Sequence, residues 1–330
     1  MAVLVVASAA GSGQGVRQTA RLVHAACRLG GEVDIALPAA DVAQGREDAR
    51  RLAGIAGVRR VLLMADARLG CWLAEPLAEM LRQVAQEREY THIVGEAGSA
   101  HRDVLGRLAG LLRAPALSDV VEVEDGRTLR RPMFAGGILA TVRLKVLPAV
   151  LLMRAVAFTP AEAGKGDAEI EELVVPAQLP CPAEVIHRAC EEEQHARPDL
   201  AQARIVLGMG RGAADEQTRV LVLRLAEKLK AAVAVTRPLV DEGIAPGEWQ
   251  VGQTGRSIAP DLYMAFGISG AHQHLAGIAD AGTIVAINTD AQAPIMQAAD
   301  LALVMDAREA LKELLRQLPQ GDDAEQNGGP

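Results

Sequence analysis

Residues 262–277 read LYMAFGISGAHQHLAG, and the order of apolar and small residues in this stretch decides the fold. The apolar run Leu262–Phe266 predicts a buried strand, and the glycine-rich turn after it leads into a helix. Small residues at the start of a helix leave backbone N–H groups free at the positive end of the helix dipole. Such a turn is suited to the phosphates of a ligand. We therefore expect a strand-turn-helix unit that binds phosphate.

The same alternation of strand and helix continues on both sides of this stretch. Further strands are expected at Arg204–Leu207, Ala232–Thr236, Thr283–Asn288 and Leu301–Met305. Helices are predicted from two leucine stripes with helical spacing, Leu221, Leu225 and Leu229, and Leu311, Leu314, Leu315 and Leu318. This alternation is typical of α/β proteins with a doubly wound parallel sheet. We predict such a domain over residues 203–318.

A separate α/β domain is predicted over residues 1–158. Its strands are expected at Val3–Ala7, Val33–Leu37, Val58–Met64 and His92–Gly95, with helices near Arg17–Leu29, Leu73–Gln86 and Arg102–Leu112. Three later extended runs, Asp119–Glu124, Ile138–Val146 and Val150–Phe158, have no helices between them, so we expect non-parallel strands at the end of this domain. Residues 159–202 are rich in Pro and Glu and predict a linker. The polar residues 319–330 predict a disordered tail.

Composition supports a soluble α/β protein with two domains. Half of the 330 residues are hydrophobic, yet only three Phe, two Trp and two Tyr are present. The net charge of −8, with no long basic run, argues against nucleic-acid binding. The cysteines match no zinc or redox spacing and are predicted to be reduced thiols. The first residues lack the features of a signal peptide and no apolar run is long enough to span a bilayer, so we expect a bacterial cytoplasmic protein without membrane insertion.

Polar and glycine-rich segments follow the ends of the predicted strands of the second domain. They are Gly208–Gly212 with Arg211, Thr236 and Arg237, Val251–Gly255, Ser269–His274, Asn288, and Asp306. Because ligands bind at the carboxyl ends of strands in open α/β sheets, we expect one ligand to contact these loops. The arginines supply permanent charges suited to a pyrophosphate or a ring edge. Asp306 is placed to accept a hydrogen bond from a ribose or an adenine, or merely to cap the helix after it.

Two other features have both a functional and an ordinary interpretation. His272 and His274 are two residues apart and point to different sides of a helix, which does not predict a metal site. One of them is placed to donate to a ligand oxygen that gains negative charge, or is simply a surface residue. The segment Gly11-Ser12-Gly13-Gln14-Gly15 follows the first strand but departs from the G-x-G-x-x-G spacing, so we predict a plain flexible loop there.

The run from Tyr263 to Gly277, continuing through Ile284–Asp290 to Ala293-Pro294-Ile295, closely resembles the signature of the electron transfer flavoprotein alpha subunit. Val251–Gly255 and Gly210–Gly212 also match that family. The resemblance is strong from about Arg197 to Leu318 and looser in the first domain, where Ala140-Thr141-Val142 carries it. It implies a heterodimer in which this chain supplies an N-terminal α/β domain, which contacts the partner subunit, and an FAD-binding domain. A beta subunit would cover the flavin and bind AMP or a second FAD.

The resemblance also implies the contacts with FAD and the role of the protein. The implied contacts are Arg211, Thr236, Val251, Gly252, Gln253, Thr254, Ser269, Gly270, Ala271, His272, Gln273, His274, Asn288 and Asp306, with Arg237, Thr254 and His274 nearest the isoalloxazine ring. Arg237 and His274 would offset negative charge on the ring, and Thr254 would tune it by hydrogen bonding.

We expect an electron carrier rather than an enzyme with its own substrate, which takes electrons from a dehydrogenase and passes them to a respiratory quinone oxidoreductase or a similar acceptor. The alternative is an NADH-dependent electron-bifurcating oxidoreductase complex. A third interpretation is a related domain that binds another nucleotide or has lost its cofactor.

The chain departs from the signature of the family at three places. His272 stands where an aliphatic residue is usual, Thr236 stands where Ser is common, and Ala213-Ala214 stand where a basic or hydroxyl residue is more frequent. Thr236 keeps the hydroxyl group, whereas His272 is expected to alter the flavin potential or its pH dependence. Together the departures predict a paralogue that serves one specialised dehydrogenase.

Overall fold

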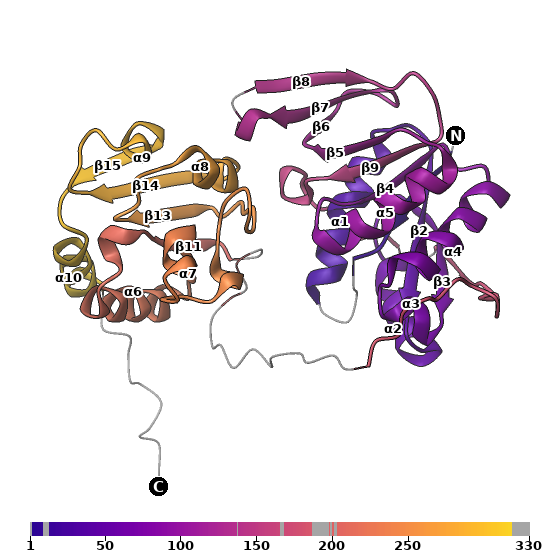
Figure 1. The fold of residues 1–330 in the computed structure, drawn as a ribbon, viewed down its shortest axis with the longest axis horizontal. Coiled ribbons are helices and arrows are strands. Elements are labelled where there is room, and N and C mark those ends of the chain that lie inside the picture. Colours follow the sequence, from indigo (N-terminus) through magenta and orange to yellow (C-terminus); the bar gives the residue numbers. More distant parts are fainter. Residues whose placement is uncertain are drawn as a thin grey trace, which may run out of the picture. The chain divides into compact units, whose positions relative to one another are not determined.

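The computed structural model describes residues 2–8, 13–136, 138–165, 168–186, 198, 200 and 203–318. It divides into two compact units, Met1–Cys190 and Glu191–Pro330, and each described part has its own sheet (Figure 1). The predicted tail, residues 319–330, lies outside the described residues, as does most of the stretch 187–202. No helix of the described part is both long and apolar enough to cross a membrane.

The first unit is built on a seven-stranded sheet with the order β10-β3-β2-β1-β4-β9-β5. Its strands are β1 (Ala2–Val6), β2 (Glu32–Ala39), β3 (Val58–Ala65), β4 (His92–Glu96), β5 (Ala116–Val120), β9 (Ala149–Met153) and β10 (Glu169–Glu172). Every neighbouring pair runs parallel. The helices are α1 (Gly13–Cys27), α2 (Val42–Ala53), α3 (Ala67–Gly70), α4 (Ala74–Glu87) and α5 (Ser99–Leu112), and a short 3-10 turn, η2 (Ala155–Ala157), follows β9.

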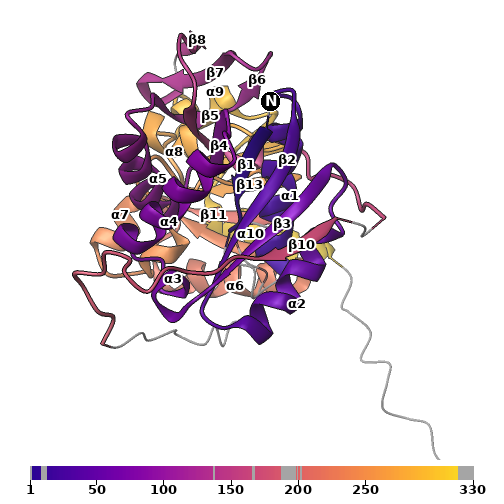
Figure 2. The same cartoon turned by 90° about the vertical axis from the view of Figure 1, so that its right-hand side faces the viewer.

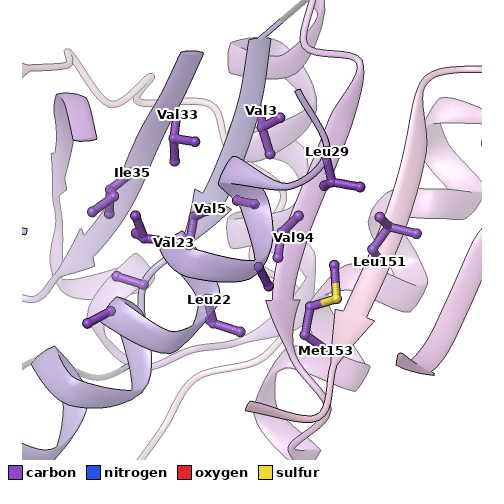
Figure 3. Close-up of a cluster of buried hydrophobic side chains, with 14 of the residues drawn as sticks. Val3, Val5, Leu22, Val23, Leu29, Val33, Ile35, Val94, Leu151 and Met153 are labelled. Carbon is purple, nitrogen blue, oxygen red and sulfur yellow. The ribbon is translucent and has the colours of Figure 1, made fainter. Parts of the chain in front are cut away.

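Helices cover both faces of this sheet (Figure 2), which explains why its strands are aliphatic along their whole length. Alternate residues of a strand point to opposite faces, so β1 contributes Val3 and Val5 to one core and Leu4 and Val6 to the other. The first core lies under α1 and α2, and Figure 3 shows the strand side chains gathered against α1. The second core lies under α3, α4 and α5.

A separate antiparallel sheet is formed by β6 (Glu122–Val123), β7 (Thr128–Met133) and β8 (Ile138–Arg143), with the turn η1 (Phe134–Gly136) between the last two. The expected non-parallel strands are therefore confirmed for β6 and β8, which lie in the runs Asp119–Glu124 and Ile138–Val146. The expectation is wrong for the run Val150–Phe158, because β9 pairs in parallel with β4 and β5 in the main sheet. Parallel strands usually need a helix between them, but here the antiparallel strands β7 and β8 return the chain to the end of the main sheet at which β9 begins. The lack of a helix before β9 therefore did not indicate an antiparallel strand.

The predicted linker, residues 159–202, contains a strand of the first sheet, and this corrects the expected boundary at residue 158. β10 pairs with β3 in parallel at the edge of the sheet. Its acidic residues meet arginines of neighbouring elements: Arg46 Nε lies 2.5 Å from Glu172 Oε1, Arg60 Nε lies 3.0 Å from Glu169 Oε2, and Arg88 Nη2 lies 2.5 Å from Glu171 Oε1. The glutamates that predict an exposed linker are equally suited to an exposed edge strand beside arginines.

Two smaller expectations for the first unit also need correction. Gly13 and Gly15 belong to the first turn of α1 rather than to a plain loop, while Gly11 and Ser12 lie outside the described residues. Helix α2 was not predicted, because its buried face includes Gly45 and Asp48 and carries no clear apolar stripe. Its N-cap is Asp41, whose Oδ1 accepts a hydrogen bond from Gln44 N at 2.9 Å.

The second unit contains the predicted doubly wound parallel sheet, with the order β12-β11-β13-β14-β15. Its strands are β11 (Ile205–Met209), β12 (Ala232–Val235), β13 (Leu262–Phe266), β14 (Thr283–Asn288) and β15 (Leu301–Val304). Its helices are α6 (Glu216–Leu229), α7 (Arg237–Asp241), α8 (His272–Ile278), α9 (Pro294–Ala298) and α10 (Ala307–Gln317), with the turns η3 (Arg211–Ala213) and η4 (Gly247–Trp249).

Both leucine stripes are confirmed in this unit. Leu225 of α6 and Leu311 of α10 are buried in one core, and the other leucines of the stripes pack against the same core. The opposite face of the sheet is covered by α8, α9 and the segment around Val251 and Ile258. The sheet is thus held between two layers, and its carboxyl edge carries the polar loops.

Candidate functional site

The carboxyl edge of the second sheet brings the predicted site residues together. Arg211 follows β11, Thr236 and Arg237 follow β12, Ser269–His274 follow β13, Asn288 ends β14, and Asp306 follows β15. The chain passes from β11 to β12 on one side and then continues at β13 on the other side of β11. Ligands of open α/β sheets bind at such a reversal of strand order.

Backbone hydrogen bonds join these loops to one another. They run from Gly212 N to Gly267 O (3.1 Å), from Thr236 N to Met209 O (3.0 Å), from Gln253 N to Gln273 O (2.8 Å) and from Ile295 N to Ser269 O (3.2 Å). The loop after η4, which holds Val251–Thr254, is therefore attached to the start of α8. Residues that are up to about sixty positions apart in sequence form one connected edge.

Two glycines make this close approach possible. Gly267 has φ +61°, and a Cβ there would lie 2.5 Å from the carbonyl carbon of Gly212. Gly270 has φ +82°, and a Cβ there would lie 2.3 Å from Ile295 N. A side chain at either position would be strained by its backbone conformation and would displace a neighbouring backbone. The turn after β13 is thus built tightly against its neighbours.

The turn after β13 offers donors that fit phosphate groups. Ser269, Ala271, His272 and Gln273 are exposed. Within the described ranges, the backbone N–H groups of Ser269, Gly270 and Ala271 donate no hydrogen bond. Unpaired N–H groups in a glycine-containing turn suit the oxygens of a pyrophosphate. The residues present therefore fit a dinucleotide cofactor.

Arg237 and Thr254, which were predicted to lie near the flavin ring, retain donors for a ligand. The Arg237 side chain is 65% exposed and uses only Nε, which donates to Asp241 Oδ2 at 3.2 Å. The hydroxyl oxygen of Thr254 accepts from Gln250 Nε2 at 2.9 Å, so its own hydrogen remains free to donate. Both side chains keep the chemistry that the resemblance assigned to them, and their contacts with the ring stay a prediction.

His274 is engaged within the protein. Its side chain is buried, its Nδ1 lies 3.0 Å from the carbonyl oxygen of Val251, and its Nε2 lies 2.9 Å from Tyr263 Oη. Burial lowers the pKa of His274, and the hydrogen bond with Val251 only partly opposes this. Burial therefore favours the neutral imidazole, and both ring nitrogens have partners inside the protein. The predicted contact of His274 with the flavin ring stays a prediction.

His272 is exposed at the first position of α8, so the two histidines do point to different sides, as their spacing predicts. A search of the described residues finds no group of three or more His, Cys, Asp or Glu side chains that is able to hold a metal ion.

Asn288 and Asp306 are engaged within the protein. Asn288 Nδ2 donates to Ile268 O at 2.7 Å, and its Oδ1 accepts from Asp290 N at 3.0 Å. Asp306 Oδ1 accepts from Arg308 N at 2.9 Å and from Glu309 N at 3.3 Å, which makes it the N-cap of α10. The capping interpretation of Asp306 is therefore confirmed, and a ribose or adenine contact stays a prediction.

Two residues that support the site were not predicted from the sequence. They are Tyr263, which contacts His274, and Gln250, which contacts Thr254. A Cβ at Gly208 would lie 2.0 Å from Tyr263 Oη, so this glycine makes room for the hydroxyl. The available signal was the tyrosine hydroxyl inside an otherwise apolar strand, since a buried hydroxyl requires a partner.

Two family models match the chain, the electron transfer flavoprotein domain over residues 3–178 and the electron transfer flavoprotein FAD-binding domain over residues 199–279. The electron transfer flavoprotein subunit alpha of Paracoccus denitrificans is 39% identical over 318 residues, which are 96% of this chain and 100% of that protein. This chain belongs to the electron transfer flavoprotein alpha-subunit family.

Other members of the electron transfer flavoprotein alpha family are similar over most of their length. The subunit alpha of Pseudomonas aeruginosa is 37% identical over 314 residues, covering 95% of this chain and 99% of that protein. The mitochondrial subunit alpha of Arabidopsis thaliana is 38% identical over 313 residues, covering 92% and 86%.

Membership confirms the resemblance seen in residues 263–295 and the cofactor, FAD, that it implied. An alpha subunit implies a heterodimer with a beta subunit. The individual FAD contacts stay predictions, and Asn288 and Asp306 lie beyond the residues that the FAD-binding model matches.

Proposed function

We propose that this chain is the FAD-carrying subunit of an electron carrier that accepts electrons from a dehydrogenase and passes them to a respiratory quinone oxidoreductase or a similar acceptor. The observation that carries the proposal is the kind of side chains that the site presents. Its accessible groups are hydrogen-bond donors and a cation suited to binding, and its buried histidine has both nitrogens paired. A neutral, fully paired imidazole is not available as a general acid or base.

FAD, when bound, supplies the electron-accepting and electron-donating chemistry. The residues of this chain hold and tune it. The turn at Ser269–Gln273 and the guanidinium of Arg211 would bind the pyrophosphate, and Arg237 with Thr254 would lie at the ring. The positive charge of the Arg237 guanidinium favours added negative charge nearby.

The first unit is proposed to contact the beta subunit, which would bind AMP or a second FAD. Its antiparallel sheet and the turn η1 carry large exposed apolar side chains: Met133, Phe134, Ile138 and Leu139 are 42–76% exposed. Clustered exposed apolar residues mark interaction sites. The exposed His272 supports a paralogue that serves one specialised dehydrogenase, and the bacterial relatives support a cytoplasmic location.

The test is to purify the chain together with its beta subunit and to mix the dimer with NADH under argon. We expect a yellow dimer whose flavin absorbance survives gel filtration and does not bleach with NADH alone. A colourless dimer would refute FAD carriage. Rapid bleaching would refute the plain carrier and favour the NADH-dependent bifurcating complex.

A further inference from the structure

Tyr263 and His274 form a buried pair beneath the predicted flavin site. Tyr263 is the second residue of β13, 0% of its surface is exposed, and its hydroxyl lies 2.9 Å from His274 Nε2. The imidazole has a second hydrogen-bond partner, the carbonyl oxygen of Val251, which lies 3.0 Å from Nδ1. The two rings are also in contact, with centroids 5.9 Å apart.

The chemistry of these partners fixes the protonation of the ring. A carbonyl oxygen only accepts, so Nδ1 must carry the hydrogen. In a neutral imidazole Nε2 is then an acceptor, and the Tyr263 hydroxyl donates to it. If His274 were protonated, Nε2 would become a donor, and the buried hydroxyl of Tyr263 would lose its acceptor. The pair therefore favours one tautomer, one charge state and one ring orientation.

The same imidazole holds the loop that carries the predicted ring contacts. Nδ1 donates to Val251, which begins the segment 251–254. Two further hydrogen bonds join this loop to α8, from Gln253 N to Gln273 O (2.8 Å) and from Ile258 N to Gly277 O (2.8 Å). Gly277 packs so closely on Gly252 that a Cβ there would lie 2.5 Å from Gly252 N. A displaced imidazole would therefore displace the loop.

We propose that Tyr263 is a positioning residue of the flavin site: its hydroxyl pairs with Nε2 of His274 and fixes the orientation of the ring, and His274 in turn fixes the Val251–Thr254 loop against which the cofactor binds. Tyr263 itself is too deeply buried to contact FAD, so it acts through His274. This inference rests on the proposed function, because the loop matters only if FAD binds there.

The first experiment needs no variant. Nitrogen NMR of ring-labelled histidine in the complete alpha–beta dimer, stripped of flavin, distinguishes protonated from unprotonated ring nitrogens. The signals of His274, identified by their loss in His274→Gln, should show a protonated Nδ1 and an unprotonated Nε2 at pH 7.5. A protonated Nε2 at that pH would overturn the proposal.

The second experiment is Tyr263→Phe, which removes the hydroxyl and keeps the ring. We expect His274 to keep its hydrogen on Nδ1, because the Val251 carbonyl oxygen remains, but Nε2 loses its partner and the ring loses its fixed orientation. FAD affinity should therefore fall about tenfold, the usual effect of one lost buried hydrogen bond. Gly208→Ala should weaken FAD binding similarly, because its Cβ would lie 2.0 Å from Tyr263 Oη and displace the hydroxyl.

The matched control is Tyr90→Phe. Tyr90 is the other tyrosine of the chain and also a buried donor, whose hydroxyl bonds to Asp34 in the first unit. It should leave the His274 signals and FAD affinity unchanged. Equal FAD affinity in Tyr263→Phe and Tyr90→Phe would overturn the positioning role. A dimer that binds no FAD but shows the expected wild-type tautomer would instead refute the proposed function.

Discussion

Replacement of Gly270 by alanine tests whether the turn after β13 is as tightly built as its geometry indicates. At φ +82° any residue with a Cβ is strained, by about 1–2 kcal/mol. The new Cβ would also lie 2.3 Å from Ile295 N and 2.8 Å from Ile295 Cα. These are backbone atoms, so the overlap is relieved only by moving the turn or α9, which costs about 1–3 kcal/mol more. We expect a total destabilisation of about 3 kcal/mol.

The same change should weaken FAD binding, because the turn supplies the proposed phosphate donors. If the turn must return to its native position for FAD to bind, a penalty of about 3 kcal/mol corresponds to an affinity loss of about 100-fold. Urea denaturation of the dimer measures the stability change, and quenching of FAD fluorescence on binding measures the affinity.

A control within the same unit separates strain from overlap. Gly243 has φ +69°, but among the described residues no heavy atom beyond its chain neighbours lies within 4 Å of the position of its Cβ. Gly243→Ala should therefore cost only the conformational term, about 1 kcal/mol, and leave FAD affinity unchanged. If Gly270→Ala and Gly243→Ala have equal stability and equal FAD affinity, the turn is not held as described.

Three further changes have defined outcomes. Arg237→Ala should lower the flavin midpoint potential by about 30–60 mV through loss of a nearby positive charge, which spectroelectrochemistry measures. Replacement of the exposed Arg224 by alanine is the control. An unchanged potential in Arg237→Ala would remove Arg237 from the site. Burial lowers the pKa of His101 to about 4. As the pH falls, the unfolded chain therefore binds the proton first, and the free energy of unfolding should fall by about 2 kcal/mol between pH 7 and pH 5. In His101→Gln the free energy of unfolding, measured with urea, should depend less on pH, and an equally steep dependence would contradict the assignment. Asp306→Ala should cost about 1 kcal/mol by removing the cap of α10, and Asp306→Asn should largely retain it; thermal denaturation compares the two.

Local patterns predicted the elements of the second unit well. The strand Leu262–Phe266 was predicted with the bounds that the structure gives it, and the leucine stripes identified the buried faces of α6 and α10. Those signals are local, because the spacing of apolar residues that is typical of a helix or strand involves only residues close together in the sequence. Because Arg211, Ser269 and Asn288 each lie at the carboxyl end of a predicted parallel strand, the sequence also predicted that they share one edge of the sheet.

Non-local pairing was not predictable in the same way. β10 is an edge strand made of Glu169–Glu172, and only its arginine neighbours, which come from distant segments, distinguish it from a linker. The parallel pairing of β5 and β9 was hidden by the hairpin between them. In both cases the deciding partner lies far away in the sequence, so no local window contains it.

The sequence by itself determined the family, the cofactor and the strand ends at which the binding residues lie, because these depend on short motifs and on strand order. Only the tertiary structure showed the partners of His274 within the protein. Its position in the motif predicts a group at the ring, and its two nitrogens are paired with Val251 and Tyr263 on other segments. A histidine's role depends on what each nitrogen meets, and those partners come together only when the chain has folded.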